Sequence, residues 1–239
     1  IYETYDYAEF LKNNEQYAES IKYYTKVLFD NWTVNKNSYA QHGEDVLVEQ
    51  LLPKGINSFI DIGANDGVLF SNTFKFAKKG AYGICIEPSS TAFLKLCLNH
   101  LFHFNVKCIR GAVSDINGKL YLKEGGYEST LSQVFTEYLD GSYKVDSYTY
   151  DSLIEKYNKF KSIDLLSVDV EGHENKIFTN LINKNIYIKI IIIESDKLEI
   201  ENLLKIEFFK DYIPKYTNGL NTFIINKNES ISHLNELPK

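Results

Sequence analysis

Residues 58–67 read Ser-Phe-Ile-Asp-Ile-Gly-Ala-Asn-Asp-Gly, and this stretch decides the fold. Its first half is a short apolar run that predicts a buried β-strand, and its second half is a turn rich in glycine. Doubly wound α/β domains hold a nucleotide-like cofactor where such a strand ends in a glycine-rich turn and opens a helix. The stretch therefore predicts an α/β domain with a cofactor site at this turn.

The residues of the turn discriminate between cofactors. A dinucleotide fingerprint needs the pattern G-x-G-x-x-G, because backbone amides must approach a pyrophosphate. Counted from Gly63, the second and third glycine positions hold Asn65 and Val68. Asp61 and Asp66 would also repel a diphosphate. The turn suits a ligand without phosphate that carries positive charge, and S-adenosylmethionine, with a sulfonium and an ammonium group, is such a ligand.

A second signal follows at the end of the next apolar run, residues 81–86, which leads into Glu87 and Pro88. An acidic residue about twenty positions after the glycine turn is placed to accept hydrogen bonds from both ribose hydroxyls. Glu87 therefore supports a nucleoside without choosing between cofactors. Pro88 ends the strand and directs the chain toward the next helix. A capped strand-to-helix connection would explain the turn alone, but with Glu87 at this offset we favour a cofactor site.

Composition limits the class of protein. The 239 residues are enough for one α/β domain with a small extension, and no apolar run reaches the length of a membrane span. The net charge is −6 and the basic residues are scattered, which argues against a nucleic-acid substrate. Three cysteines are too few for a disulfide framework and lack C-x-x-C spacing, so we expect a reducing, cytoplasmic location.

Residues 1–37 differ from the rest and predict an N-terminal helical extension, with the main domain at residues 38–239. Apolar residues recur there at helical spacing, and Asn13-Asn14 divides them into two helices. Residues 17–24 resemble the second helix of a tetratricopeptide repeat. We expect a helical cap packed on the main domain; the alternative is a surface for a protein partner or for self-association. Because the chain begins at Ile1 and contains no methionine, we expect the natural N-terminus to lie upstream.

Strands and helices alternate from residue 38 onward, which predicts a doubly wound, mostly parallel sheet with helices on both faces. We expect a hairpin turn at Asn117-Gly118, followed by a short strand and a polar, flexible stretch at residues 125–132. A closing antiparallel hairpin is expected around Asn218-Gly219. The expected parallel strands lie near residues 58–62, 82–86, 105–109, 163–168 and 187–193.

Carboxylates collect at the expected carboxyl ends of these strands, where open α/β sheets bind ligands. Acidic groups facing one crevice repel each other unless a cation is bound. The sulfonium cofactor would provide that cation, and so would a divalent metal. The segments at this edge contain Asp61, Glu87, Ala112-Val113-Ser114-Asp115, residues 169–174 and Glu194.

Three of these residues are candidates for catalysis. Asp169 follows the fourth strand, where it would contact the methionine amine, hold a metal or orient an acceptor hydroxyl. His173 would serve as general base, because its pKa lies near neutrality, or it is a surface residue at a helix start. Glu194 ends a very apolar strand, where a carboxylate is costly without a partner. Glu171 and Glu44 are second choices.

Several of these segments together resemble the FkbM family of S-adenosylmethionine-dependent methyltransferases, over about residues 39–226. The resemblance implies a class I methyltransferase fold, related to the Rossmann fold. It places the cofactor at Asp61, Gly63, Asn65, Gly67 and Glu87, and we add Gln41, Pro88, Ala112 and Asp169. It does not identify the catalytic base. The segments that carry it are residues 40–45, 59–67, 87–88, 112–115 with Gly118, and 168–174.

Members of this family typically methylate a hydroxyl of a sugar or natural product, so the resemblance implies O-methylation of a small-molecule or glycan acceptor. Enzymes that methylate exocyclic amines commonly carry an Asn/Asp-Pro-Pro-aromatic motif after the fourth strand. Here residues 169–172 read Asp-Val-Glu-Gly, which disfavours an amine acceptor. The alternative from a different class is a non-catalytic adaptor that keeps the cofactor-binding fold and uses its N-terminal helices for interaction.

Overall fold

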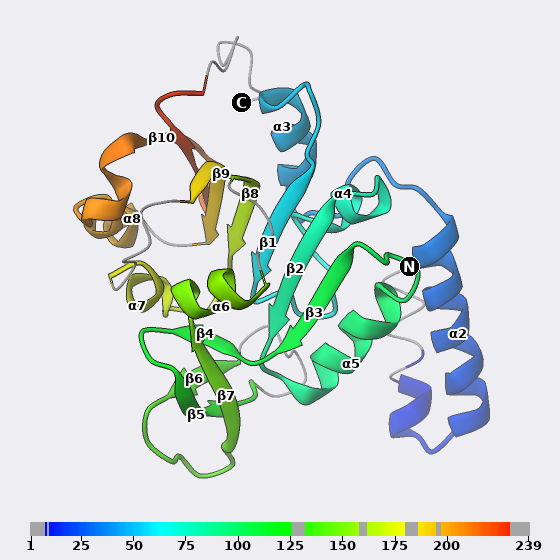
Figure 1. The fold of residues 1–239 in the computed structure, drawn as a ribbon. Helices are drawn as coiled ribbons and strands as arrows, with labels where there is room; N and C mark the ends of the chain where they lie inside the picture. Colours follow the sequence, from blue (N-terminus) through cyan, green and yellow to red (C-terminus); the bar gives the residue numbers. More distant parts are fainter. Residues whose placement is uncertain are drawn as a thin grey trace.

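The computed structural model describes Ala8 and residues 10–125, 132–157, 162–179, 186–194 and 197–229. A mostly parallel sheet forms its centre (Figure 1). Among the described residues this sheet has seven strands, in the order β10 (Tyr212–Thr217), β11 (Asn221–Asn226), β9 (Tyr187–Glu194), β8 (Ser162–Val168), β1 (Ser58–Ile62), β2 (Tyr82–Glu87) and β3 (Val106–Arg110). The five parallel strands expected from the sequence are all present.

The strand order reverses at β1. This strand pairs in parallel with β2 on one side and with β8 on the other, and β9 continues the parallel sheet beyond β8. The strands β11 and β10 complete that edge as an antiparallel hairpin, as predicted. In a doubly wound sheet, such a reversal opens a crevice at the carboxyl ends of the two diverging strands. The topology therefore places a ligand site beyond β1 and β8.

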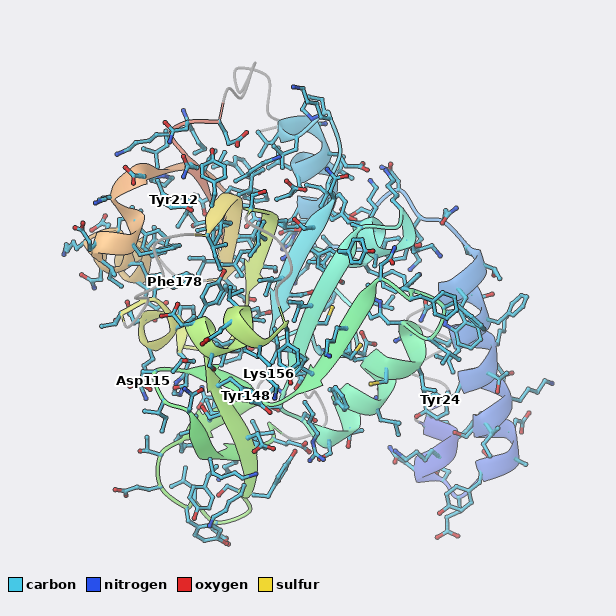
Figure 2. All side chains as sticks on the ribbon, viewed as in Figure 1. Tyr24, Asp115, Tyr148, Lys156, Phe178 and Tyr212 are labelled. Atoms are coloured by element: carbon cyan, nitrogen blue, oxygen red, sulfur yellow. The ribbon has the colours of Figure 1, made fainter. Side chains whose placement is uncertain are left out.

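Helices cover both faces of the sheet, which explains why its strands are apolar on both sides. On one face, α3 (Glu44–Leu51), α4 (Phe74–Lys78) and α5 (Ser90–Asn99) contribute to a core with Phe59 and Leu165. On the other face lie α6 (Tyr150–Tyr157), α7 (Glu174–Thr179) and α8 (Lys197–Leu203). Figure 2 labels Phe178 and Tyr212 on this second face, where both pack beside the ring of Phe209.

The N-terminal segment is helical in its described part. Residues 10–13 are helical, a break follows at residues 14–16, and α2 (Tyr17–Thr33) then runs beside α5 (Figure 1). Asn31 and Trp32 join α2 to α5 by donating hydrogen bonds to Asn99 Oδ1 at 2.9 Å and to the carbonyl of Leu98 at 3.1 Å. These contacts agree with a helical cap. Residues 1–7 and 9 lie outside the described part, and the domain boundary after residue 37 stays a prediction.

A second, smaller sheet was not expected from the sequence. Its described strands are, in order, β4 (Ala112–Ser114), β7 (Tyr143–Thr149), β5 (Gly118–Lys123) and β6 (Gln133–Phe135). Figure 1 shows this sheet beyond the end of the main sheet at which β3 finishes. The small sheet therefore stands at the same edge as the predicted ligand site. Most of the predicted flexible stretch, residues 126–131, lies outside the described residues.

The predicted hairpin at Asn117-Gly118 is wrong. The strands on either side of it do not pair, because β7 lies between them, parallel to β4 and antiparallel to β5. The side chain of Asn117 is engaged elsewhere: Oδ1 accepts hydrogen bonds from Thr149 N at 2.9 Å and Ser152 Oγ at 2.7 Å. Asn117 and Gly118 therefore do not form a hairpin turn. This segment lies across the end of β7, and Asn117 binds Ser152 at the start of α6.

Candidate active site

The glycine turn after β1 brings three strand ends together. The amides of Gly63 and Ala64 both donate to the carbonyl of Ile86 at 3.0 Å, and the amide of Asp169 donates to the carbonyl of Ile62 at 2.9 Å. Gly63 has φ +84°, and a β-carbon there would lie 1.7 Å from the carbonyl oxygen of Asp169. Only glycine fits at this position, which lets the ends of β1, β2 and β8 meet.

The turn does not open directly into a helix, contrary to the expectation from the sequence. The next helix, α4, begins only at Phe74. Before it, Asp66 Oδ1 accepts hydrogen bonds from the amides of Val68 at 2.8 Å and Leu69 at 2.7 Å. Because Asp66 binds its own backbone, the chain stays in turns, and this carboxylate is directed to the protein rather than to a ligand.

A cavity of about 310 Å³ lies at this edge of the sheet, where the strand order reverses. Its volume is at the lower end of the range for small-molecule sites. The structure brings together most of the residues expected to bind the cofactor. Those that line the cavity are Gln41, Gly63, Asn65, Glu87, Pro88, Ala112 and Asp169, and they are joined by Glu171 and Glu194.

Two predicted cofactor residues, Asp61 and Gly67, lie behind the cavity wall. Asp61 is buried in β1 and accepts a hydrogen bond from Thr73 Oγ1 at 2.6 Å, and burial raises its pKa to about 6. Gly67 has φ +80°, and a β-carbon there would lie 2.6 Å from Leu96 Cδ1 of α5. Both residues shape the turn from behind, so any effect they have on a ligand passes through the backbone of the turn.

Glu87 lies at the end of β2 and is held by two backbone amides. Its Oε2 accepts from Asn65 N at 2.9 Å and its Oε1 accepts from Ser89 N at 2.7 Å. Burial raises the pKa of Glu87 to about 7, and these two hydrogen bonds oppose the rise. A carboxylate oxygen has more than one lone pair, so each oxygen can accept a further hydrogen bond from a ligand hydroxyl.

Asp169 and Glu194 form a carboxyl pair in the same cavity. The carboxyl group of Glu194 lies close to that of Asp169, and two carboxyl groups can share a hydrogen bond only when one of them holds a proton. Burial, followed by the charge of Glu194, raises the pKa of Asp169 well above its ordinary value. Burial also raises the pKa of Glu171, with the charge of Glu194 adding to the effect. A cation bound here would relieve the repulsion among these groups.

The carboxylate ring expected from the sequence is only partly assembled. Glu174 is buried at the start of α7, where Oε1 accepts from the amides of Val170 at 3.3 Å and Gly172 at 3.4 Å. Asp115 accepts a hydrogen bond from Ser114 Oγ at 2.8 Å and does not line the cavity; Figure 2 labels it beyond β4, on the side of α7. Both carboxylates therefore support the local structure.

His173 lines a neighbouring cavity rather than the one that contains Asp169. Its Nε2 lies 2.6 Å from the carbonyl oxygen of Val134 in β6, so this nitrogen carries a hydrogen and donates it. Its Nδ1 is buried and has no hydrogen-bond partner in the described part of the chain. Burial lowers the pKa of His173, which favours the neutral ring.

Glu44, the other second-choice base, is also separated from the cavity. It is buried at the start of α3 and accepts hydrogen bonds from Asn218 Nδ2 at 2.6 Å, Asn221 Nδ2 at 2.9 Å and the amide of His42 at 2.8 Å. The two asparagine contacts tie α3 to the C-terminal hairpin. Glu44 therefore positions Asn221, which does line the cavity, and is not a candidate base.

Sequence reasoning missed several residues of the cavity wall. Phe70 lines it with 45% of its surface exposed, in the rare left-handed conformation (φ +56°) and bridged to Ala40. Asn221 stands opposite Glu194 in the pairing of β11 with β9. The predicted C-terminal hairpin could have identified Asn221 as a neighbour of Glu194. No sequence signal marked Phe70 or Val134.

The chemistry of the wall fits S-adenosylmethionine. Glu87 is available to ribose hydroxyls, and the Asp169–Glu194 pair is available to positive charge. Among the described residues that line the cavity there is no lysine or arginine, so a pyrophosphate would meet carboxylates and no cationic side chain. A divalent metal is not supported in the same way. Within the described ranges, no group of three or more His, Cys, Asp and Glu side chains could hold a metal ion.

Comparisons with known proteins identify a matching family and similar solved structures. A sequence profile described as the methyltransferase FkbM domain matches residues 61–218, about two thirds of the chain. The structure of an FkbM methyltransferase from Methylobacillus flagellatus KT is similar, with 15% identity and a TM-score of 0.45. The match covers 72% of this chain and 43% of that chain, so the present chain corresponds to less than half of that protein.

Two further structures are similar to this chain. One is precorrin-6y C5,15-methyltransferase from Geobacter metallireducens GS-15, with 12% identity and a TM-score of 0.44, covering 81% of this chain and 90% of that chain. The other is a 16S rRNA N2 G1207 methyltransferase from T. thermophilus, with 16% identity and a TM-score of 0.42, covering 81% and 44%. Curated protein sequences gave no match. In the described residues, no helix combines the length and apolar character needed to cross a membrane.

Proposed function

The chain belongs to the FkbM family of methyltransferases and has the predicted α/β fold, and from this premise we propose that it transfers a methyl group from S-adenosylmethionine to a hydroxyl of a small acceptor, a sugar or natural product. The observation that carries the proposal is the composition of the 310 Å³ cavity: Glu87 at one strand end, the Asp169–Glu194 pair at two others, and no basic side chain among its described lining residues. We place the reaction in the cytoplasm, where free thiols such as that of Cys85 persist.

The chain's own residues would bind the cofactor at three points. Glu87 would accept hydrogen bonds from the ribose hydroxyls, with its two oxygens already oriented by the amides of Asn65 and Ser89. The backbone of Gly63, which lines the cavity, would lie against the ligand. Asp169 and Glu194 would face the positively charged part of the ligand. A ligand cation would lower the pKa of Asp169, so the proton shared by the pair would leave when the cofactor binds.

When bound, S-adenosylmethionine supplies a methyl carbon on a positively charged sulfur; its carbon–sulfur bond breaks with both electrons passing to sulfur as the acceptor oxygen forms the new bond. The protein must align the hydroxyl and exclude water, and proximity of this kind can supply about 7–11 kcal/mol of barrier reduction in well-oriented cases. The hydroxyl must also lose its proton. We propose that the Asp169–Glu194 pair, which would be deprotonated when the cofactor binds, receives this proton.

An assay with methyl-labelled cofactor tests the proposal. The protein is incubated with a panel of hydroxylated small molecules and a matched panel of primary amines, and the products are identified by mass spectrometry and NMR. We expect methyl ethers from the hydroxylated panel only. Labelled products confined to the amines would exclude O-methylation, and an absence of binding by both S-adenosylmethionine and S-adenosylhomocysteine would exclude the proposed cofactor.

A further inference from the structure

A second cavity lies between the small sheet and the start of α7. Its volume is about 520 Å³, and its walls come from β6 and the following loop on one side and from residues 171–176 on the other. Val134 and Glu171 line both this cavity and the proposed cofactor cavity. The two spaces therefore meet at Val134 and Glu171, beside Asp169 and its partner Glu194.

The wall of the second cavity alternates hydrogen-bonding and apolar side chains. Amide, hydroxyl, carboxylate, imidazole and ammonium groups all contribute, and they include both donors and acceptors. An apolar ligand would leave the polar groups that it covers without partners, and an anion would meet two carboxylates against a single ammonium group. The polar residues are Gln133, Thr136, Glu137, Glu171, His173 and Lys176, and the apolar side chains include Phe135 and Leu139.

Resting on the function proposed above, we infer that this second cavity is the acceptor site and that it takes a neutral, polyhydroxylated ligand such as a sugar ring. A ring of this kind offers hydroxyls to the polar side chains and carbon–hydrogen surface to Phe135 and Leu139. Bound here, it presents a hydroxyl to the first cavity where Val134 and Glu171 form the common wall. The small sheet, which the sequence did not predict, is then the part of the protein that selects the acceptor.

His173 is a positioning residue in this arrangement. Its hydrogen bond of 2.6 Å to the carbonyl of Val134 fixes β6 against the start of α7 and so sets the width of the passage between the cavities. The other ring nitrogen, Nδ1, has no partner in the described residues. Because Nδ1 is also closed off from solvent, the role of His173 here is to hold Val134 rather than to contact the ligand.

Blocking the second cavity tests the inference. Thr136 and Gln133 are exposed and line it, so Thr136→Trp and Gln133→Trp add bulk without disturbing the core. Asp140→Trp is the matched control, because Asp140 is exposed in the loop after β6 but does not line the cavity. The probes are the methyl glycosides of glucose, galactose, mannose, rhamnose, fucose and xylose. Their binding is measured by NMR titration, with and without S-adenosylhomocysteine.

We expect the wild-type protein to bind at least one glycoside, with a Kd on the order of 1–10 mM as is usual for contacts worth a few kcal/mol. Both cavity-blocking variants should weaken that binding roughly 10-fold or more, about 1.4 kcal/mol, while the Asp140→Trp variant should not. Equal binding by all three variants would mean that the acceptor site lies outside the second cavity. If no glycoside binds, the ligand is not a neutral sugar ring. Affinity for S-adenosylhomocysteine, measured separately, reports on the proposed function and should be the same in every variant.

Discussion

The main chain of Asp169 occupies the space that a side chain at Gly63 would need: a β-carbon on residue 63 would lie 1.7 Å from the Asp169 carbonyl oxygen. The turn after β1 and the end of β8 are therefore in direct backbone contact. This contact fixes the position from which the Asp169 side chain enters the cavity. The cofactor turn and the proposed proton acceptor are thus parts of one rigid unit.

Substituting Gly63 by alanine should destabilise the protein more than the same change at another glycine with positive φ. Gly55 is the matched control, because its φ is +90° and a β-carbon there meets nothing within 4 Å. We expect Gly55→Ala to cost about 1–2 kcal/mol from backbone strain alone. Gly63→Ala should cost a further ~1–3 kcal/mol from the clash with Asp169. Urea denaturation of both variants measures the difference, and equal losses would show that the contact is not tight.

Replacing Asp169 by asparagine should change how stability depends on pH. The pKa of Asp169 is raised in the folded state above its ordinary value of 3.8, so its favourable contribution is complete below that value and is lost as pH rises through the folded-state pKa. The amide of asparagine can still donate to Glu194 but does not ionise. The ligand-free wild type should therefore lose stability relative to Asp169→Asn, by at most about 1.4 kcal/mol per pH unit.

This second prediction is checked by denaturation of both proteins across the range from about pH 4 to about pH 8. Using the difference between the two proteins removes the contributions of the other titrating groups they share. A difference in the free energy of unfolding that stays constant over the whole range would mean that the pKa of Asp169 is not raised by folding, so that the folded protein does not retain a proton on this carboxyl group.

Substitutions at Glu194 and His173 should separate proton acceptance from positioning. Glu194→Gln keeps the shape but removes the base, so we expect kcat to fall by roughly 10²–10⁴, a larger effect than any loss of affinity for S-adenosylhomocysteine. His173→Ala should mainly raise KM for the acceptor, because it loosens Val134 in the wall between the cavities. His173→Gln, which can still donate to that carbonyl, should restore part of the loss.

The same assay tests the metal alternative. The described residues contain no cluster that could hold a metal ion, so a chelator should leave turnover unchanged. Loss of activity with chelator, restored by a divalent cation, would assign the activation of the hydroxyl to a metal instead. A large fall in kcat for His173→Ala with an unchanged KM would make His173 the base rather than a positioning residue.

The main sheet was predictable because its strands are long apolar runs whose ends carry specific turn residues. Residues 58–67 identified β1 and its turn, and Glu87 marked the end of β2 at the expected offset. The small sheet was not predictable in the same way. Its strands β4 and β6 are three residues each, and β7 inserts between β4 and β5 from later in the chain. Such pairing depends on tertiary packing rather than on local pattern.

The cofactor end of the site was more predictable than the acceptor end. Gly63, Asn65 and Glu87 lie in local motifs, and all three line the first cavity. That Asp61 and Gly67 lie behind the wall, and that His173 lines the neighbouring cavity, depends on tertiary contacts. Asp61 binds Thr73, Gly67 lies against Leu96 of α5, and His173 binds Val134 of β6. No local motif encodes these contacts.

The most direct test of the central claim is isothermal titration calorimetry of S-adenosylhomocysteine and, separately, of NAD, into the wild-type protein and two variants. Glu87→Ala should weaken S-adenosylhomocysteine binding by about 1–3 kcal/mol, because the ribose hydroxyls lose a charged acceptor. Glu124→Ala is the control, since Glu124 accepts a hydrogen bond from Ser89 Oγ and does not line the cavity. We predict one S-adenosylhomocysteine bound per chain and no binding of NAD. Preferential binding of NAD, or S-adenosylhomocysteine binding that is unchanged in Glu87→Ala, would contradict the account.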